Sequence, residues 1–480
     1  MTLLESLATF VATTTPERVP DEVAVSVRER ILDTLGLCLA ALPVETSRHA
    51  HAMALAKGGP EEATVVGFGT KLPASHAAFV NGVLAHTLDF DDTHLPSVLH
   101  PSASLVPTAL AVGEATGASV EAVVTAAATG YEVCVRTGMV AYDRALGNSV
   151  FFERGWHATS ICGTLASAAV AAKLYGLDAA GIGHAVAIAA SMGSGVIEAN
   201  RSGGSVKRLH CGWAAQAGIT AADLARHGFT GPPTVFEGRF GFFQAFCGGL
   251  VDPDAITRGL GQAWCVPGIF YKPYPANHFT HGGIDAARAL RHSVVLDDIT
   301  DIELGVAAPT LRTIAEPRDQ KVRPRSGYHA QFSGPFTVAA ALLGGGGLGL
   351  WLDDFSDAKA SDARYLALAE KVRVVADDEC SRIFPNQFPA VLRITTRDGR
   401  VHEARVMANR GGPGQPLSSE ELLLKFTTNA GCVLSAEGAA SLGRSVLALA
   451  GPSVAPIMRA TIAPERQARP ADRESVAVSS

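Results

Sequence analysis

The sequence contains little charge and few aromatic residues for its length. Asp, Glu, Lys and Arg account for 18% of its 480 residues, and Phe, Trp and Tyr for 6%. The formal net charge of −6 argues against nucleic acid or an anionic membrane as the main partner, because both attract strongly basic proteins. A small anionic substrate is compatible with this composition, since local charge decides how such a ligand binds.

Cysteines are few and widely spaced. All eight occur singly, and no two of them form a CxxC pair. Zinc knuckles and iron–sulfur clusters use closely spaced cysteines, so the sequence predicts neither. Reduced cysteines packed in the core of a cytoplasmic protein explain this spacing most simply.

Several sequence signals of other protein classes are absent. The N-terminus carries Glu5 and no basic segment before its apolar run, which is unlike a secretory signal peptide. Residues 326–352 lack Asp, Glu, Lys and Arg, but four successive glycines indicate a buried helix followed by a loop rather than a membrane span. No Lys-Ser/Thr pair follows these glycines and no GxSxG motif occurs, so neither a phosphate-binding loop nor a serine-hydrolase elbow is predicted.

The first half of the chain reads as helices rich in alanine and glycine. Apolar residues recur at helical spacing in segments such as 26–42 and 76–88, and several later segments are apolar on most faces. Small side chains let helices pack closely, and helices that are apolar all round belong in a core. We therefore predict a compact helical domain over residues 1–268.

The pattern changes at about residue 269. Alternating residues in ITDIELGVAAP and VRVVADD predict strands, and Asp398-Gly399 between two alternating runs predicts a β-hairpin. Residues 269–408 are thus predicted to form an α+β domain. Ser418 or Ser419 is a suitable N-cap for a helix within 409–450, which could return to the first domain. Residues 451–480 are rich in proline and polar residues, and we predict that they are disordered.

Reactive side chains are concentrated in four segments that flank predicted helices, where catalytic groups often lie. The first, HTLDFDDTHLPSVLHPS at 86–102, contains Asp89, Thr93, His100 and Ser102. The other three are RGWHATSICG with His157, NRSGGSVKRLHCGW with Lys207 and Arg208, and YKPYPANHFTHGGIDA with Lys272, His278 and His281.

These segments allow more than one chemistry. A metal ion could be bound by Asp89, Asp92, His94 and His100, but their spacing fits no template such as HExxH. General acid–base catalysis on an anionic substrate fits better, because lysine and arginine hold carboxylates and histidine transfers protons near neutral pH. Purely structural roles are open as alternatives, above all for His86, Asp91, Asp92 and His210.

Together these segments resemble the MmgE/PrpD family. The matching motifs follow the family's order over roughly residues 5–450 and are HTLDFDDTH, HPS, GWHATSICGTLASAAVAAKLYGLD, SVKRLHCGWAAQAGITAADLARHGFTGP, FEGRFGFFQAF, KPYPANHFTHGGIDA, AQFSGPFTVAAAL and LLLKFTTNA. The resemblance implies a mainly α fold, in which a large helical domain at 1–268 is completed by 409–450 and a smaller α+β lid domain spans 269–408. It also implies a homodimer without a metal or organic cofactor.

The resemblance further implies an active site. The family's positions fall on Asp89, Thr93, His100, His157, Lys207 and a histidine that is either His281 or His278. We expect Lys207 to bind a substrate carboxylate with support from Arg208, and His100 and His157 to transfer protons. His278, Ser102 and Lys272 are expected to contact substrate. Many relatives carry a tyrosine at the position of Phe336, so this chain lacks one hydroxyl group of the family pattern.

Members of this family act on small polycarboxylates at the carbon beside a carboxylate. The resemblance therefore predicts a lyase, in first place a hydro-lyase like 2-methylcitrate dehydratase. Decarboxylation, as in cis-aconitate decarboxylase, and epimerisation, as in iminodisuccinate epimerase, are the alternatives in the same fold. A non-catalytic protein that binds a carboxylate ligand and a metal-dependent hydrolase are the alternatives of other classes.

Overall fold

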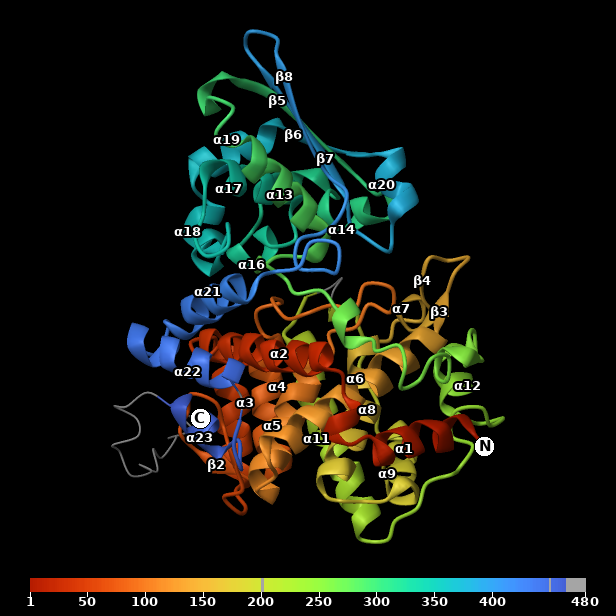
Figure 1. Cartoon of the computed structure of the whole chain (residues 1–480). Helices are drawn as coiled ribbons and strands as arrows, with labels where there is room; N and C mark the ends of the chain where they lie inside the picture. The colour runs from red at the N-terminus through yellow and green to blue at the C-terminus, as the bar shows by residue number, and fades with distance from the viewer. Residues whose placement is uncertain (200–202, 449, 463–480) are drawn as a thin grey trace, which may run out of the picture.

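The computed structural model describes residues 1–199, 203–448 and 450–462. Figure 1 shows a large body of helices with a smaller part beside it that contains the main sheet. This arrangement is the mainly α fold that the sequence predicts. No helix of the described residues is long and apolar enough to cross a membrane.

The large body is formed by the first half of the chain. Its helices are α1 (Leu3–Thr13), α2 (Asp21–Ala40), α3 (Glu45–Lys57), α4 (Ala74–His86), α5 (Ser102–Thr116), α6 (Val120–Val140), α7 (Val150–Glu153), α8 (Ala158–Leu174), α9 (Ala179–Ala190), α11 (Val206–Arg226) and α12 (Phe242–Cys247). Two short hairpins, β1 (Ala63–Thr64) with β2 (Lys71–Leu72) and β3 (Tyr142–Asp143) with β4 (Asn148–Ser149), lie between them.

Small residues let the central helices touch backbone to backbone. A Cβ atom added to Gly212 of α11 would lie 2.4 Å from the carbonyl oxygen of Phe79, and one added to Gly82 of α4 would lie 2.8 Å from the Cα of Gly212. Glycine at both positions therefore allows α11 to pack directly on α4. This close packing brings the start of α11 beside the end of α4, where the first reactive segment begins.

The last helices pack against the first domain. These are α21 (Ser419–Ala430), α22 (Ala436–Ala448) and α23 (Ala455–Ala460), and α21 and α22 lie against α2. A Cβ atom on Gly36 would meet the ring of Phe426 at 3.0 Å, so the two helices are in close contact. Helix α21 begins with the predicted N-cap Ser418, whose hydroxyl accepts a hydrogen bond from the backbone of Glu421 in a capping box.

The smaller part carries a four-stranded sheet in the order β6-β5-β7-β8. Its strands are β5 (Ile299–Val306), β6 (Val372–Ala376), β7 (Ala390–Thr396) and β8 (Val401–Val406). Only the β5–β6 pair is parallel, and β7 and β8 form the predicted hairpin. Helices of this part are α13 (His281–Leu290), α14 (Leu311–Ile314), α15 (Arg318–Val322), α16 (Gly327–Ala330), α17 (Gly334–Leu343), α18 (Asp357–Ala360), α19 (Ala363–Lys371) and α20 (Asp378–Ile383).

Two further sequence predictions meet the structure here. The uncharged window at 326–352 forms the short helices α16 and α17 and then a glycine loop, as predicted. The prediction of disorder from residue 451 is wrong for the described part of the tail, because α23 buries Ile457 and Met458 against the body of the protein. These apolar residues pack against the protein, which the overall proline-rich composition of the tail does not indicate. Residues 463–480 lie outside the described residues.

Candidate active site

The loop after α4 presents Asp89 to two lysines. The Nζ atom of Lys207 lies 2.9 Å from Asp89 Oδ1, and that of Lys272 lies 3.3 Å from the same oxygen. Lys272 also donates a hydrogen bond to the Asp89 carbonyl oxygen at 2.8 Å. Burial alone would raise the pKa of the Asp89 carboxyl group. The ammonium groups of Lys207, which has the larger effect, and of Lys272 outweigh burial and hold that pKa well below its ordinary value. Asp89 is therefore ionised, and the three side chains carry one surplus positive charge.

Backbone pairing places the lysines. Thr93 and Phe270 exchange two backbone hydrogen bonds of 2.8 Å, which align the KPYP segment with the DDT segment and bring Lys272 to Asp89. Lys207 comes from the first turn of α11, which the Gly82–Gly212 contact presses against α4. Lys207 is half-buried, and its pKa is raised because Asp89 outweighs the cost of burying the charge.

The loop is also conformationally strained. Among the described residues, Asp89 and Val98 are the non-glycine residues with positive φ, at 51° and 53°. A β-branched residue such as valine seldom adopts this conformation, and strain of this kind is typical of functional loops. The two strained positions bracket the segment that connects Asp89 to His100.

Three histidines converge beside the lysines. The ring centroids of His86 and His100 are 5.2 Å apart, those of His86 and His157 are 5.8 Å apart, and those of His100 and His157 are 6.5 Å apart. Burial lowers the pKa of His100 to about 3 and that of His157 well below its ordinary value. Both rings are therefore neutral at pH 7 in the protein without substrate.

The hydrogen bonds of His100 fix which ring nitrogen carries its proton. Its Nδ1 lies 2.8 Å from the carbonyl oxygen of Asp92, and a carbonyl oxygen only accepts, so Nδ1 is the protonated nitrogen. Its backbone N–H donates to Thr159 Oγ1 of α8 at 3.1 Å, and Thr93 Oγ1 lies 3.3 Å from Nδ1. The Nε2 atom is left with a free electron pair, which is the state required of a general base.

Asp91 and Asp92 hold the residues around the histidine cluster through buried hydrogen bonds and an ion pair. Asp91 Oδ2 accepts a hydrogen bond from His86 Nδ1 at 2.8 Å, and Asp92 Oδ2 lies 2.6 Å from a guanidinium nitrogen of Arg30. The hydroxyl group of Ser102 donates to Asp92 at 2.5 Å and lies 2.5 Å from the hydroxyl group of Tyr131. The buried hydroxyl group of Ser102 is thus engaged within the scaffold, and the expectation that it contacts substrate stays a prediction.

The KPYP segment contributes two buried histidines, His278 and His281, with ring centroids 4.6 Å apart. His281 Nε2 lies 3.1 Å from the carbonyl oxygen of Ala276 and is therefore engaged. Neither ring nitrogen of His278 has a hydrogen-bond partner among the described residues. Its ring instead packs edge-on against Phe270 and Phe388. An unpaired buried imidazole is costly, and a ligand that pairs with it removes that cost.

The lid domain adds a side chain that the sequence analysis missed. Tyr328 of α16 is 41% exposed and lies beside Lys207 and Asp89, whose charges act on its pKa, while its partial burial is the main cause that raises this pKa. The guanidinium group of Arg208 lies 5.2 Å from the centroid of the Tyr328 ring and donates to Thr46 Oγ1 at 3.2 Å. Only the proximity of Tyr328 to α11 in space reveals it, since no motif marks it.

Phe336 lies away from this cluster. Its ring is fully buried and stacks on Tyr365 with centroids 5.6 Å apart, inside the lid domain. A hydroxyl group at this position would therefore lie inside the lid domain.

Sequence comparisons connect this site to known proteins. Residues 5–253 match the MmgE/PrpD N-terminal domain, and residues 274–449 match the MmgE/PrpD C-terminal domain. The chain belongs to the MmgE/PrpD family. The predicted homodimer is a separate matter and stays a prediction, since the structure describes one chain.

Similar proteins in the MmgE/PrpD family include cis-aconitate decarboxylases and 2-methylcitrate dehydratases. Cis-aconitate decarboxylase of Homo sapiens is 30% identical over 456 residues, which cover 92% of this chain and 90% of the relative. A cis-aconitate decarboxylase-like protein of Aspergillus oryzae is 27% identical over 465 residues, covering 92% and 93%. The 2-methylcitrate dehydratase of Cupriavidus necator is 27% identical over 440 residues, covering 84% of each chain.

The metal site considered from sequence does not form in this MmgE/PrpD protein. Asp92 is paired with Arg30, and His94 Nδ1 lies 2.5 Å from the hydroxyl group of Ser97, so neither side chain converges on Asp89. Within the described residues, ligand atoms of His86, Asp91 and Cys211 do lie within 4.8 Å of one another. Burial raises the pKa of the Cys211 thiol well above its ordinary value, so the protonated sulfur is a poor metal ligand.

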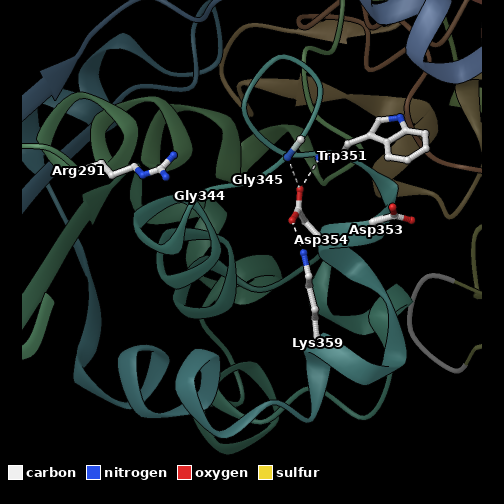
Figure 2. Close-up of a pocket in the computed structure, with 8 residues that line it drawn as sticks. Arg291, Gly344, Gly345, Trp351, Asp353, Asp354 and Lys359 are labelled. Carbon is white, nitrogen blue, oxygen red and sulfur yellow. Dashed lines mark hydrogen bonds and ion pairs between the residues drawn. The ribbon is translucent and has the colours of Figure 1, made fainter.

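The glycine run of the lid domain borders a cavity (Figure 2). The cavity has a volume of about 460 Å³ and lies beside Gly344–Gly346, Arg291 and Trp351. Asp354 lines this cavity, accepting hydrogen bonds from the backbone of Gly346 at 2.9 Å and of Trp351 at 2.8 Å and pairing with Lys359 at 2.6 Å. The glycine run thus wraps around a carboxylate of its own chain, in agreement with the predicted plain loop.

Proposed function

We propose that this protein is a lyase that acts beside a carboxylate of a small tricarboxylic acid, with decarboxylation of a cis-aconitate-type substrate as the first candidate. The observation that carries the proposal is the ionised Asp89 held between Lys207 and Lys272, beside the neutral rings of His100 and His157. Similarity to cis-aconitate decarboxylases over about nine-tenths of the chain supports decarboxylation as the first candidate, ahead of the dehydration that the sequence analysis favours.

Binding of the substrate rests on the surplus positive charge around Asp89. Lys207, which remains protonated and is only partly buried, offers an ammonium group to a substrate carboxylate. Arg208 and Tyr328 lie at the same side and extend this polar surface toward the lid domain. His278 offers an unpaired ring nitrogen to a second carboxylate.

Decarboxylation requires stabilisation of the negative charge that develops on the substrate, and one proton for the substrate carbon. The carbon–carbon bond to one carboxylate breaks and carbon dioxide leaves. The electron pair shifts through the neighbouring double bond onto a carbon beside a remaining carboxylate. Lys207 stabilises this developing charge, and interactions that strengthen in the transition state are the ones that accelerate a reaction. His157 then donates its Nε2 proton to the carbon.

Dehydration of a 2-methylcitrate-type hydroxy acid is the second candidate. It is favoured by the similarity to a 2-methylcitrate dehydratase and by the free electron pair on His100 Nε2. In this reaction His100 removes the proton beside the carboxylate, and His157 protonates the leaving hydroxyl group as water. Asp89 would keep Lys207 and Lys272 in place in both reactions.

Proton NMR of the purified, chelator-treated protein in D₂O tests the proposal. The substrates are cis-aconitate, citrate, 2-methylcitrate and related di- and tricarboxylates. We expect cis-aconitate to lose its spectrum and to yield a deuterated dicarboxylate with a new alkene signal. A new alkene signal from a hydroxy acid would support dehydration instead, and a change of stereochemistry alone would support epimerisation. No change with any substrate would contradict catalysis and favour a carboxylate-binding protein.

A comparison of the two KPYP histidines tests their roles. We expect His278→Ala to raise KM for the tricarboxylate about tenfold or more, because a lost charge-assisted hydrogen bond costs about 1.5–3 kcal/mol. His281→Ala is expected to lower thermal stability with a smaller effect on KM, since its ring already bonds a backbone carbonyl. Steady-state kinetics and thermal unfolding of both variants provide the measurement. The opposite ranking of the two KM values would assign the substrate contact to His281.

A further inference from the structure

Two buried histidines on different helices face each other through the same ring atom. His157 Nδ1 and His210 Nδ1 are 2.8 Å apart, and the ring centroids are 4.9 Å apart. A hydrogen bond between two such nitrogens requires one proton and one electron pair, so one of the two Nδ1 atoms is protonated. In the neutral pair, the tautomer of either ring then determines the tautomer of the other.

The two histidines have different surroundings. His157, at the N-cap of α8, lies against the histidine cluster, 5.8 Å from His86 between ring centroids. His210, in α11, lines a cavity of about 460 Å³ with Ser194, Leu209 and Trp213, which we call the outer cavity. Since the Nδ1 atoms face each other, each Nε2 atom lies on the far side of its own ring. The hydrogen bond from Ser160 Oγ to the His210 carbonyl oxygen, at 3.2 Å, ties the two helices at this point.

Neutral histidine alone is a poor proton donor. Burial and the neighbouring His86 and His210 keep His157 neutral, with its pKa well below the ordinary value. A neutral imidazole that gives up its Nε2 proton becomes an imidazolide anion, unless Nδ1 gains a proton in the same step. A proton donor placed on Nδ1 removes this obstacle, and the group in that position is His210.

We propose that His157 and His210 form a proton relay between the active site and the outer cavity, with His210 as the positioning and proton-supplying partner of His157. This inference rests on the proposed function, because it concerns the proton which that reaction delivers. The His157 Nε2 proton goes to the substrate carbon, the His210 Nδ1 proton goes to His157 Nδ1, and His210 Nε2 takes a proton from water in the outer cavity. Both rings are neutral before and after the transfer. When product has left, water in the emptied site protonates His157 Nε2 and the shift reverses, so each turnover consumes one proton from water.

Chemical rescue tests the relay. We expect His210→Ala to lower kcat about 100-fold, within the usual range for a proton-transfer group, while KM changes less than about threefold. Added imidazole should enter the space left by the ring and restore at least about a tenth of the lost activity. Pyrazole, which has the same size and is a far weaker base, should restore none. His227→Ala, at the far end of the same helix, is the matched control and should retain wild-type kcat.

Other outcomes overturn the relay. Normal kcat in His210→Ala, equal rescue by imidazole and pyrazole, or a change confined to KM would each reduce His210 to a packing residue. If the alanine variant does not fold, ¹⁵N NMR of histidine-labelled wild-type protein tests the relay. The relay requires one protonated and one unprotonated Nδ1 in this pair, and any other protonation pattern would contradict it. Wild-type protein that turns over no tricarboxylate would refute the proposed function, whereas turnover without these His210 effects would refute the relay alone.

Discussion

Replacement of Lys207 by methionine is expected to lower kcat/KM by about 10²- to 10³-fold, the usual loss when one preorganised charge stabiliser is removed. Methionine keeps most of the length of the side chain and removes the ammonium group that lies 2.9 Å from Asp89. The carboxylate retains Lys272, so it does not become an unpaired buried charge. Steady-state kinetics with the substrate identified by NMR, together with a thermal unfolding curve, provide the measurement.

Two variants sharpen this prediction. Arg208→Met removes the neighbouring positive charge on the same helix, and we expect a smaller loss because that guanidinium group is held by Thr46 and Tyr328. Lys207→Arg keeps the charge and changes its shape, so it should recover part of the activity. Near-normal kcat/KM in Lys207→Met would contradict the assignment, and so would an equal loss in Arg208→Met.

The sequence predicts the parts of the site that local patterns mark. Asp89, His100 and Lys207 lie in recognisable segments that flank helices, and the structure brings these segments together. The β7–β8 hairpin is equally predictable, because Asp398-Gly399 imposes a tight turn between alternating strands. In both cases neighbouring residues in the chain carry the information.

Contacts between distant segments could not be predicted in this way. His86 is the central ring of the histidine cluster, although a single histidine at the end of an apolar helix resembles a structural residue. The partners of Ser102 include Tyr131, which no motif connects to it. Tyr328 reaches the site from the lid domain, and His210 meets His157 across 53 residues of sequence. Hydrogen-bond partners of this kind follow from tertiary packing and leave no local pattern.

The pair of Arg30 and Asp92 is the scaffold on which the site depends, and its disruption should have the largest effect on stability. Arg30 is 1% exposed, pairs with Asp92 at 2.6 Å, and donates to the carbonyl oxygens of Val266 and Ile269 at 3.1 and 2.7 Å. Arg30→Met leaves the Asp92 carboxylate buried without its cation, and the loss of one partner of a buried pair costs about 3–5 kcal/mol. Urea unfolding should show this decrease in the free energy of unfolding.

A double variant separates the cost of an unpaired charge from the value of the pair itself. Replacement of a whole buried ion pair by apolar residues is often nearly neutral, so Arg30→Met with Asp92→Leu should be more stable than Arg30→Met alone. The double variant should still lose activity, because the backbone and the hydroxyl group of Ser102, two residues after His100, lose the Asp92 carboxylate as their acceptor. Arg364→Met breaks an exposed pair with Asp362 and should cost less than about 1 kcal/mol. A double variant no more stable than Arg30→Met would show that Arg30 acts through its bonds to Val266 and Ile269 rather than through Asp92.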